Sequence, residues 1–253
     1  MDLQLRGKTA LVTGASSGIG RAVAIGLAAE GVNLCVVARR RELLESLSAE
    51  IVAAGGTAPA IVISDVMQEG APQKLAQDAL RELGYIEILA NCAGGAWPVS
   101  ISGPEQQWLD AMTLNFTRVR QLTLAVVPGM MERKWGRIIS ISGSSEPSKV
   151  EAGTAPKAAL HGFAKGLSRE VGRHGITVNS ISPGPGKIMS EQIRRKYTDE
   201  FIRDFSEREI PVGRFGRPEE LAYLAVCLAS PLSSYITGNV IHVDGGTHRF
   251  AFT

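Results

Sequence analysis

The regular alternation of short apolar runs with longer amphipathic stretches constrains the fold of this chain more than any other feature of its sequence. Seven runs have the length and the β-branched composition of buried strands, and they cover residues 9–12, 34–38, 60–63, 86–90, 138–141, 176–181 and 240–243. Helical patterns lie between them, at residues 19–29, 42–54, 71–83, 105–133, 155–173 and 218–229. Because parallel strands need crossover helices and are buried on both faces, this order predicts an α/β fold with a doubly wound parallel sheet of about seven strands.

The composition is that of a globular protein, with 44% hydrophobic and 21% charged residues among 253. No Pro/Gly/Ser-rich linker or block of charge divides the chain, so we predict a single domain over residues 1–253. The formal net charge is +2, and no basic run is interleaved with aromatic residues. This pattern does not favour a nucleic-acid partner, and we expect a small-molecule substrate instead.

Other sequence features indicate the environment of the protein. The first residues lack the apolar stretch of a signal peptide, and no run reaches the roughly 18 apolar residues that span a bilayer. Cys35, Cys92 and Cys227 are widely spaced and lie in apolar segments, without the spacing of a metal site. We therefore expect a cytoplasmic protein with reduced thiols, no membrane contact and no bound metal.

A glycine-rich turn joins the first predicted strand to the first predicted helix. Residues 13–20 read TGASSGIG, which places Gly14, Gly18 and Gly20 at G-x-x-x-G-x-G spacing and adds the hydroxyls of Ser16 and Ser17. Glycine permits a tight turn and close approach of the backbone to phosphate, and the helix that follows directs its free N–H groups at the anion. The turn indicates a site for a dinucleotide pyrophosphate. A structural turn without a ligand is the alternative.

The charges after the second predicted strand bear on the choice of dinucleotide. An NAD-specific site would place Asp or Glu here to bind the ribose 2′-hydroxyl, but the chain has Arg39 and Arg40. Arg39, with Arg40 in support, is suited to charge-assisted contacts with a 2′-phosphate, so we predict NADP(H) rather than NAD(H). Alternatively, the arginines begin a surface helix with Glu42 and Glu45 as partners.

Two further strand ends supply candidate cofactor contacts. Asp65, with Val66 beside it, follows the third predicted strand and is a candidate acceptor for an adenine amino group or a turn residue. The run NCAG follows the fourth, with Asn91, Ala93 and Gly94. Its small residues would let the backbone lie against the adenine ribose, and an Asx turn is the alternative.

Several motifs, read in order along the chain, carry a resemblance to a known family. They are TGASSGIG, NCAG, Asn115 within a helix, GRIISIS at 136–142, Lys157 in PKAAL, ITVNSISPG at 176–184, IPVGRFGRPEELA at 210–222 and SYITGNVIHVDGG at 234–246. In these motifs the chain resembles the short-chain dehydrogenase/reductase family, and within it the 3-oxoacyl-carrier-protein reductase-like branch. The resemblance implies a Rossmann-type domain that binds NAD(P) and forms homotetramers or homodimers, with helices 105–133 and 155–173 at a dimer interface.

The resemblance also assigns roles to residues. It implies catalytic roles for Asn115 and Lys157, and Ser142 and Ser144, which flank the family's serine position, complete the candidate catalytic group. It implies cofactor contacts from Gly14, Ser16, Ser17, Gly18, Ile19, Gly20, Arg39, Arg40, Asp65, Val66, Asn91, Ala93, Gly94, Lys157, Pro183, Gly184 and Ile188.

The chain departs from the family pattern where the proton donor is expected. The family carries its catalytic tyrosine four residues before the lysine, and this chain has Gly153 there. Gly143 occupies the position of the family's catalytic serine, between Ser142 and Ser144. Ile188 stands where the family usually has a threonine that holds the nicotinamide carboxamide.

Several groups are candidates to replace the missing acid. A water molecule in the space above Gly153, or Lys157 itself with a lowered pKa, would serve, and Lys157 would also be suited to a Schiff base. Tyr197, in the charged segment 190–209, is a less favoured candidate, and that segment is either a mobile flap or a surface helix. Glu146 and Glu151 are solvated loop carboxylates unless desolvated, and His161 is more simply a helix residue.

From the sequence we therefore expect an oxidoreductase that interconverts a carbonyl and an alcohol with an atypical active site. Two alternatives stay open. One is a lyase, dehydratase or isomerase on the same scaffold, and the other is a catalytically inactive protein that binds a dinucleotide.

Overall fold

The computed structural model describes residues 1–95, 99, 102–144, 150–184 and 188–248. Its centre is one parallel sheet with the strand order β3-β2-β1-β4-β5-β6-β7. The strands are β1 Thr9–Thr13, β2 Asn33–Ala38, β3 Ala60–Ile63, β4 Ile88–Asn91, β5 Gly136–Ile141, β6 Ile176–Ser182 and β7 Val240–His242. The predicted α/β fold with a seven-stranded parallel sheet is confirmed, and the predicted strand ends are correct to within two residues.

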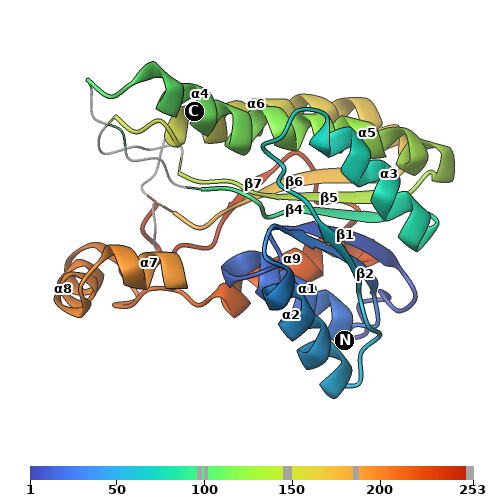
Figure 1. Ribbon diagram of the computed structural model, residues 1–253, viewed down its shortest axis with the longest axis horizontal. Helices are drawn as coiled ribbons and strands as arrows, with labels where there is room; N and C mark the ends of the chain where they lie inside the picture. The colour runs from blue at the N-terminus through green and yellow to red at the C-terminus, as the bar shows by residue number, and fades with distance from the viewer. Residues whose placement is uncertain (96–98, 100–101, 145–149, 185–187, 249–253) are drawn as a thin grey trace.

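Helices cover both faces of this sheet (Figure 1). One layer contains α1 Gly18–Ala29, α2 Arg41–Ala53 and α9 Pro218–Ala229. The other contains α3 Ala71–Leu83, α4 Glu105–Met112, α5 Arg118–Arg133 and α6 Thr154–Val171. Alternate strand residues supply two separate apolar cores, as Val12 packs with the first layer and Leu11 with the second. This two-sided burial explains why the strands read as continuous apolar runs.

The strand order reverses at β1, which lies between β2 and β4. The connections from β1 and β4 therefore leave toward opposite layers, and a crevice opens beyond the carboxyl ends of these two strands. The glycine-rich turn after β1 and the NCAG run after β4 both lie at this edge.

The long helix predicted over residues 105–133 is interrupted. A π-helical turn, η1 Thr113–Thr117, separates α4 from α5. The side chain of Asn115 explains the interruption, because its Nδ2 donates to the carbonyl oxygen of Ala111 at 3.1 Å, within the helical ladder. π-turns of this kind occur mostly at functional sites.

The charged segment 190–209 forms two helices, α7 Glu191–Lys196 and α8 Asp199–Glu209. The break falls at Tyr197 and Thr198, where Thr198 Oγ1 caps α8 by accepting from the N–H of Phe201 at 3.2 Å. Both helices lie outside the two layers, beyond the carboxyl ends of the strands (Figure 1).

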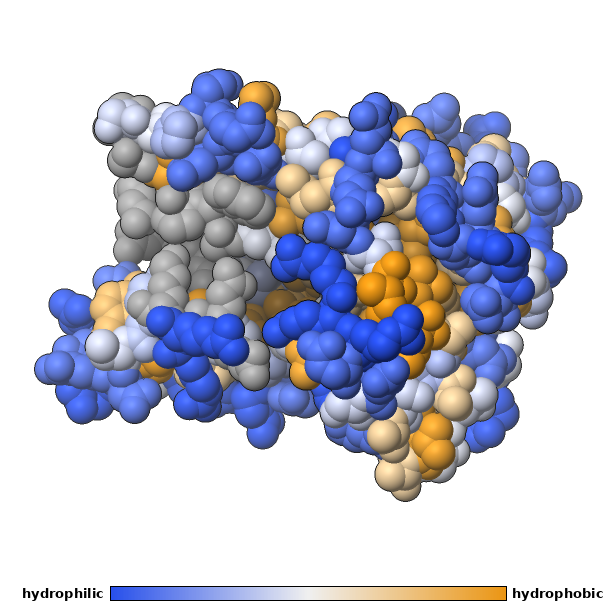
Figure 2. Space-filling model, in the orientation of Figure 1, coloured by the Kyte–Doolittle hydropathy of each residue, from blue (hydrophilic) through white to orange (hydrophobic). Residues whose placement is uncertain are grey.

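The face drawn in Figure 1 is mostly hydrophilic, apart from an orange patch near the edge of the sheet (Figure 2). In the edge strand β3, the side chain of Ile63 is partly exposed. Among the described residues, no helix combines the length and the apolar character needed to cross a bilayer. Cys35, Cys92 and Cys227 are all free thiols.

Candidate functional site

At two positions of the turn after β1, Gly14 and Gly20, there is no space for any side chain. A Cβ on Gly14, whose φ is +68°, would lie 2.8 Å from the backbone nitrogen of Ala93. A Cβ on Gly20 would collide with the carbonyl oxygen of Gly14 itself. The turn therefore folds back against α1 and the β4 loop, and it holds the amino end of α1 at the crevice.

The first turn of α1 has the properties of an anion site. The helix begins at Gly18, and within the described part of the chain the Ser17 side chain makes no capping hydrogen bond. The first N–H groups of the helix are thus left to bind a ligand, and the helix dipole favours a negative one. Ile19 lies in the same turn, and its partly buried side chain packs against the core.

Of the arginines after β2, Arg40 rather than Arg39 reaches the glycine-rich turn. Arg40 Nη2 donates to the hydroxyls of Ser16 and Ser17, at 3.3 Å each. Arg39 Nη1 lies 3.9 Å from a carboxylate oxygen of Asp65 and is largely exposed. Asp65 forms a turn in which its Oδ1 accepts from the N–H of Met67 at 3.0 Å. Of these two arginines, Arg40 therefore brings its positive charge to the glycine-rich turn.

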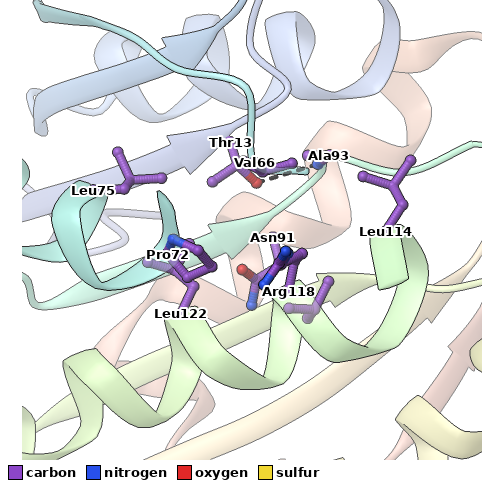
Figure 3. A pocket seen from close by; sticks show the side chains of 10 residues that line it. Thr13, Val66, Pro72, Leu75, Asn91, Ala93, Leu114, Arg118 and Leu122 are labelled. Carbon is purple, nitrogen blue, oxygen red and sulfur yellow. Dashed lines mark hydrogen bonds between the residues drawn. The ribbon is translucent and has the colours of Figure 1, made fainter. Parts of the chain in front are cut away.

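A small cavity lies beside this turn, at the carboxyl ends of β1 and β4. Figure 3 shows Val66 and Ala93 on one side of the space and Leu114, from the π-turn, on another. Its lining residues are Thr13, Val66, Pro72, Leu75, Asn91, Ala93, Leu114, Arg118, Val119 and Leu122. The walls of the cavity are mostly apolar, and Thr13, Asn91 and Arg118 are its polar lining residues.

Two polar residues of this cavity, Thr13 and Arg118, were not selected from the sequence. Thr13 Oγ1 accepts from the N–H groups of Cys92 and Ala93, at 3.1 Å each, and so fixes the loop after β4 (Figure 3). Arg118 Nη2 donates to the carbonyl oxygen of Met67 at 2.9 Å. Thr13 was visible as the first residue of the glycine-rich motif, whereas no sequence signal marked Arg118.

Asn91, predicted as a cofactor contact, has its side-chain amide turned into the protein. Its Nδ2 lies 3.2 Å from Thr123 Oγ1 in α5 and 3.3 Å from Ser140 Oγ in β5. These bonds connect β4 to helix α5 and to strand β5. Asn91 also borders the cavity.

Lys157 and Asn115 meet beside Gly94. Lys157 Nζ donates to the carbonyl oxygen of Ile141 at 2.9 Å. Asn115 Oδ1 accepts from the N–H of Gly95 at 3.1 Å. A Cβ on Gly94 would lie 3.1 Å from Lys157 Nζ and 3.2 Å from Asn115 Oδ1, so the glycine leaves the space in which the two side chains converge.

The ammonium group of Lys157 is desolvated. Burial lowers the pKa of Lys157 from 10.5 to about 8, against a small opposing influence of Cys92. Burial also raises the pKa of the Cys92 thiol to about 12, which keeps this thiol protonated and inert. A lysine with a pKa close to neutral can give up and regain a proton under physiological conditions.

The segment around Gly143 packs directly on this lysine. A Cβ on Gly143 would lie 3.3 Å from Lys157 Cγ, so a serine there would press on the lysine stem. The neighbouring Ser142 is buried, and its hydroxyl donates to the carbonyl oxygen of Ile181 at 3.2 Å. Ser144 is half-buried. Gly153 is the residue before α6, one helical turn ahead of Lys157.

All four tyrosines of the chain lie in the described part of the structure. The ring of Tyr85 lies under the guanidinium of Arg133, before the amino end of β4. Tyr223 and Tyr235 are exposed. Tyr197, proposed above as a substitute acid, stacks on Phe201 with ring centroids 4.6 Å apart.

The remaining candidates have different positions. Glu151 is half-buried, and its carbonyl oxygen accepts from the N–H of Thr154. Glu146 lies outside the described residues. Ile188 is 6% exposed and packs in the core of the α1 layer, while the N–H of the adjoining Met189 donates to the carbonyl oxygen of Gly216.

Pro183 and Gly184 follow β6 at the same edge of the sheet, and Gly184 has a φ of +67°. The two residues, which we predicted from the sequence as cofactor contacts, therefore lie at the carboxyl end of β6. Among the described residues, no group of three or more His, Cys, Asp or Glu side chains is placed to hold a metal ion.

Comparison with known proteins adds to this geometry. Residues 14–248 match a family model described as enoyl-(acyl carrier protein) reductase. The chain is 33% identical to the 3-oxoacyl-(acyl-carrier-protein) reductase of Aquifex aeolicus over 256 residues, which covers 97% of this chain and 99% of the relative. It is similar in structure to a 7 alpha-hydroxysteroid dehydrogenase complexed with NADH and 7-oxo glycochenodeoxycholic acid, with a TM-score of 0.91, 30% identity and coverage of 97% and 96%. A 3-oxoacyl (acyl-carrier-protein) reductase from Agrobacterium tumefaciens with NADP bound gives a TM-score of 0.91, 29% identity and coverage of 97% and 96%.

Proposed function

Because this chain belongs to the short-chain dehydrogenase/reductase family, and to the oxidoreductases of its 3-oxoacyl-(acyl-carrier-protein) reductase-like branch, we propose that it interconverts a small-molecule carbonyl and an alcohol with NADP(H). The cofactor supplies or accepts the hydride when bound. The chain's own residues bind the cofactor and transfer the proton to or from the substrate oxygen. Each of these two tasks has its support in the described residues.

The residues present fit a dinucleotide. Because Gly14 and Gly20 have no side chain, the glycine-rich turn packs closely against the neighbouring backbone and does not fill the crevice. The first turn of α1 would hold the pyrophosphate. The mostly apolar lining that includes Val66 and Leu114 would pack against the adenine ring. We propose that Gly18, Asp65, Ala93, Pro183 and Gly184 border the same ligand through their backbone or turn geometry.

The position of Arg40 supports NADP(H) over NAD(H). Its guanidinium lies on the hydroxyls of Ser16 and Ser17, and an arginine is suited to hold a phosphate group by charge-assisted bonds. Asp65, the nearest acid, is engaged with Arg39 and with a backbone N–H. The Agrobacterium tumefaciens relative has NADP bound, while the hydroxysteroid dehydrogenase has NADH, so the fold accommodates either carrier.

We propose that Lys157 takes over the proton transfer for which the family uses a tyrosine. The observation that carries this proposal is the desolvated ammonium beside Asn115, with a pKa lowered to about 8. In carbonyl reduction, Lys157 would give its proton to the developing alkoxide oxygen, directly or through a water above Gly153. In alcohol oxidation, its neutral amine would accept that proton.

The magnitude of the change can be bounded. A well-placed general acid contributes roughly 10² to 10⁴ in rate, or about 3 to 5 kcal/mol of barrier. Lys157 recovers part of this contribution, and a water-mediated transfer recovers less than direct contact. We therefore expect measurable but slow reduction.

The direct test measures nicotinamide absorbance during incubation of purified protein with a panel of 3-oxoacyl thioesters and ketones. NADPH oxidation should be seen with at least one class, and Lys157→Met should lower kcat by about 10² or more without weakening NADPH binding to the same extent. Carbonyl reduction should decline as the pH rises through about 8, because the ammonium is the required form. If no member of the panel is reduced, or if the lysine variant retains the wild-type rate, the proposal fails.

A gain-of-function variant sharpens this test. Gly153→Tyr would restore a phenol one helical turn before Lys157, so it should raise kcat with the same substrate. Gly143→Ser is the less favourable restoration, because its Cβ would press against Lys157 Cγ at 3.3 Å. A Gly153→Phe variant, with a ring but no hydroxyl, is the matched control and should not accelerate the reaction.

We also propose that the protein forms a homotetramer or homodimer. Large apolar side chains are exposed on α4 and α5, including Leu109, Met112 and Leu124. Exposed apolar groups on neighbouring helices are typical of surfaces that pair with another copy. Sedimentation should give a mass above that of one 26.9 kDa chain, and Leu124→Glu should lower it. A monomeric wild type would contradict this proposal.

A further inference from the structure

A buried polar layer lies between α6 and the sheet, under Lys157. Residues alternate along β6, and Ile181 packs in the core on the α1 side whereas Val178 packs on the α6 side. Ser180 and Ser182 therefore face α6. Helix α6 lies in the upper layer of Figure 1 and packs against β6. On this face of β6, the apolar residue Val178 is therefore followed by the hydroxyl groups of Ser180 and Ser182 near the carboxyl edge of the sheet.

Three polar atoms of this layer are buried without a hydrogen-bond partner among the described residues. They are Ser180 Oγ, Ser182 Oγ and His161 Nε2. The two serines are 0% exposed. A buried polar group without a partner costs about 1 to 3 kcal/mol, and proteins normally satisfy such groups with ordered water. Three of them on one face indicate that water molecules occupy this layer.

Further residues extend this polar layer toward Lys157 and toward the surface. His161 follows Lys157 by one helical turn on the same face of α6. Ser182 lies directly opposite His242 in the β6–β7 register. The His242 ring stacks on His248 with centroids 3.7 Å apart, and His242 Nδ1 is 3.9 Å from a carboxylate oxygen of Asp244. His248 is exposed, so the series of polar groups reaches solvent.

We propose that Ser180, Ser182 and His161, with the water bound between them, form a proton path between Lys157 and solvent at His242 and His248. This inference rests on the proposed function, in which Lys157 loses one proton in each carbonyl reduction. One proton enters at the histidine pair and one arrives at the neutral Lys157 amine. No net charge accumulates in the layer.

The charge state of His161 suits this role. Burial, with smaller contributions from His242 and Lys157, lowers the pKa of His161 from 6.5 to about 4, so its imidazole is neutral at working pH. A neutral imidazole has one donor and one acceptor nitrogen, and it passes a proton on by accepting at one and releasing from the other. His161 touches neither cofactor nor reacting atoms in this scheme and acts as a relay residue.

The first test does not depend on turnover. A crystal structure of the protein at high resolution should contain ordered water within hydrogen-bond distance of Ser180 Oγ, Ser182 Oγ and His161 Nε2. A dry layer overturns the inference. Exchange of the Lys157 ammonium protons with D₂O, followed by ¹⁵N-lysine NMR, should be about tenfold slower in a Ser180→Ala/Ser182→Ala/His161→Leu variant. Equal exchange rates overturn the inference, whether or not a substrate has been found.

The second test uses a substrate identified by NADPH oxidation. His161→Ala should lower kcat about tenfold, leave the Kd for NADPH unchanged, and recover when imidazole is added to the buffer. Ser168→Ala is the matched control, because this buried serine of α6 already donates to the carbonyl oxygen of Lys165 at 2.8 Å. If the His161 variant keeps the wild-type kcat, or is slow without rescue by imidazole, the layer is only structural. Absence of any NADPH oxidation would contradict the proposed function instead.

Discussion

At the scale of single residues, the two adjacent arginines Arg39 and Arg40 point to different parts of the structure, although nothing in the sequence distinguishes them. Arg39 extends toward Asp65, and Arg40 returns to the hydroxyls of Ser16 and Ser17. The side chains of neighbouring residues at the end of a strand point in different directions, so only one of them reaches the turn after β1. We had expected Arg39 to make the principal phosphate contact, and the geometry favours Arg40.

This difference gives a prediction about cofactor selectivity. Arg40→Ala should weaken NADPH binding by roughly 10- to 100-fold, since a charge-assisted bond contributes about 1.5 to 3 kcal/mol, and should leave NADH binding nearly unchanged. Fluorescence titration with both cofactors measures the effect. Arg41→Ala is the control from the same run, because Arg41 lies 3.7 Å from Glu45 and away from the turn. Equal losses in the two variants would mean that Arg40 acts only through general charge.

The lowered pKa of Lys157 has a consequence for stability. Between pH 8 and pH 10.5 the unfolded chain binds a proton at this site that the native protein does not, so the stability contributed by the site rises with pH in this window. Below pH 8 the native protein holds a desolvated charge. Lys157→Met should therefore be more stable than wild type at about pH 7, and this advantage should shrink by about pH 9.5.

Urea denaturation at the two pH values measures the difference in free energy of unfolding between Lys157→Met and wild type. Lys165→Met, at an exposed position of the same helix, is the control and should show no such pH dependence. A difference that is constant with pH would show that the ammonium is not desolvated.

At the scale of elements, the π-turn between α4 and α5 is the feature that positions the site. Its extra residue per turn lets Asn115 bond both the carbonyl oxygen of Ala111 and the N–H of Gly95. Leu114, in the same turn, borders the cavity at the end of β4. One irregular turn therefore contributes both to the cavity and to the pair of Asn115 and Lys157 beside Gly94.

Asn115→Ala should remove both bonds and let the turn relax toward an α-helix. We expect a loss of about 1 to 3 kcal/mol in stability and a decrease in kcat that exceeds the change in NADPH binding. Asn179→Ala is matched to it, because Asn179 likewise donates to one backbone carbonyl, of Ile236, and accepts from one N–H, of Asn239, far from Lys157. Both variants should lose stability, but only Asn115→Ala should lose kcat. If the Asn115→Ala and Asn179→Ala variants had similar kcat values, Asn115 would have no specific role in the reaction.

At the scale of the whole molecule, one buried arginine connects three parts of the fold. Arg137 in β5 is 1% exposed and donates to the carbonyl oxygens of Gly136, Gly175 and Ser230. These bonds join β5 to the turn before β6 and to the end of α9. Burial lowers the pKa of Arg137 to about 10, so it keeps its charge at neutral pH.

Arg137→Met should destabilise the whole protein, because carbonyl oxygens in the interior lose their donor. We expect a loss of about 2 to 5 kcal/mol, which corresponds to roughly 5 to 15 °C in Tm for a chain of this size. Thermal denaturation measures it, with the exposed Arg173→Met as the control. A Tm within about one degree of wild type would show that packing replaces these bonds.

The sequence by itself determined the order of strands and helices, the parallel sheet and the glycine-rich turn, because these depend on local periodicity and on backbone space at Gly14 and Gly20. Only the tertiary structure decided which arginine reaches the turn, that Asn91 faces inward, and that Arg118 borders the cavity, because these depend on contacts between residues far apart in the chain. The polar layer under Lys157 belongs to the second group. Ser180, Ser182 and His161 appear as ordinary strand and helix residues until the β6–β7 register and the packing of α6 bring them to one face.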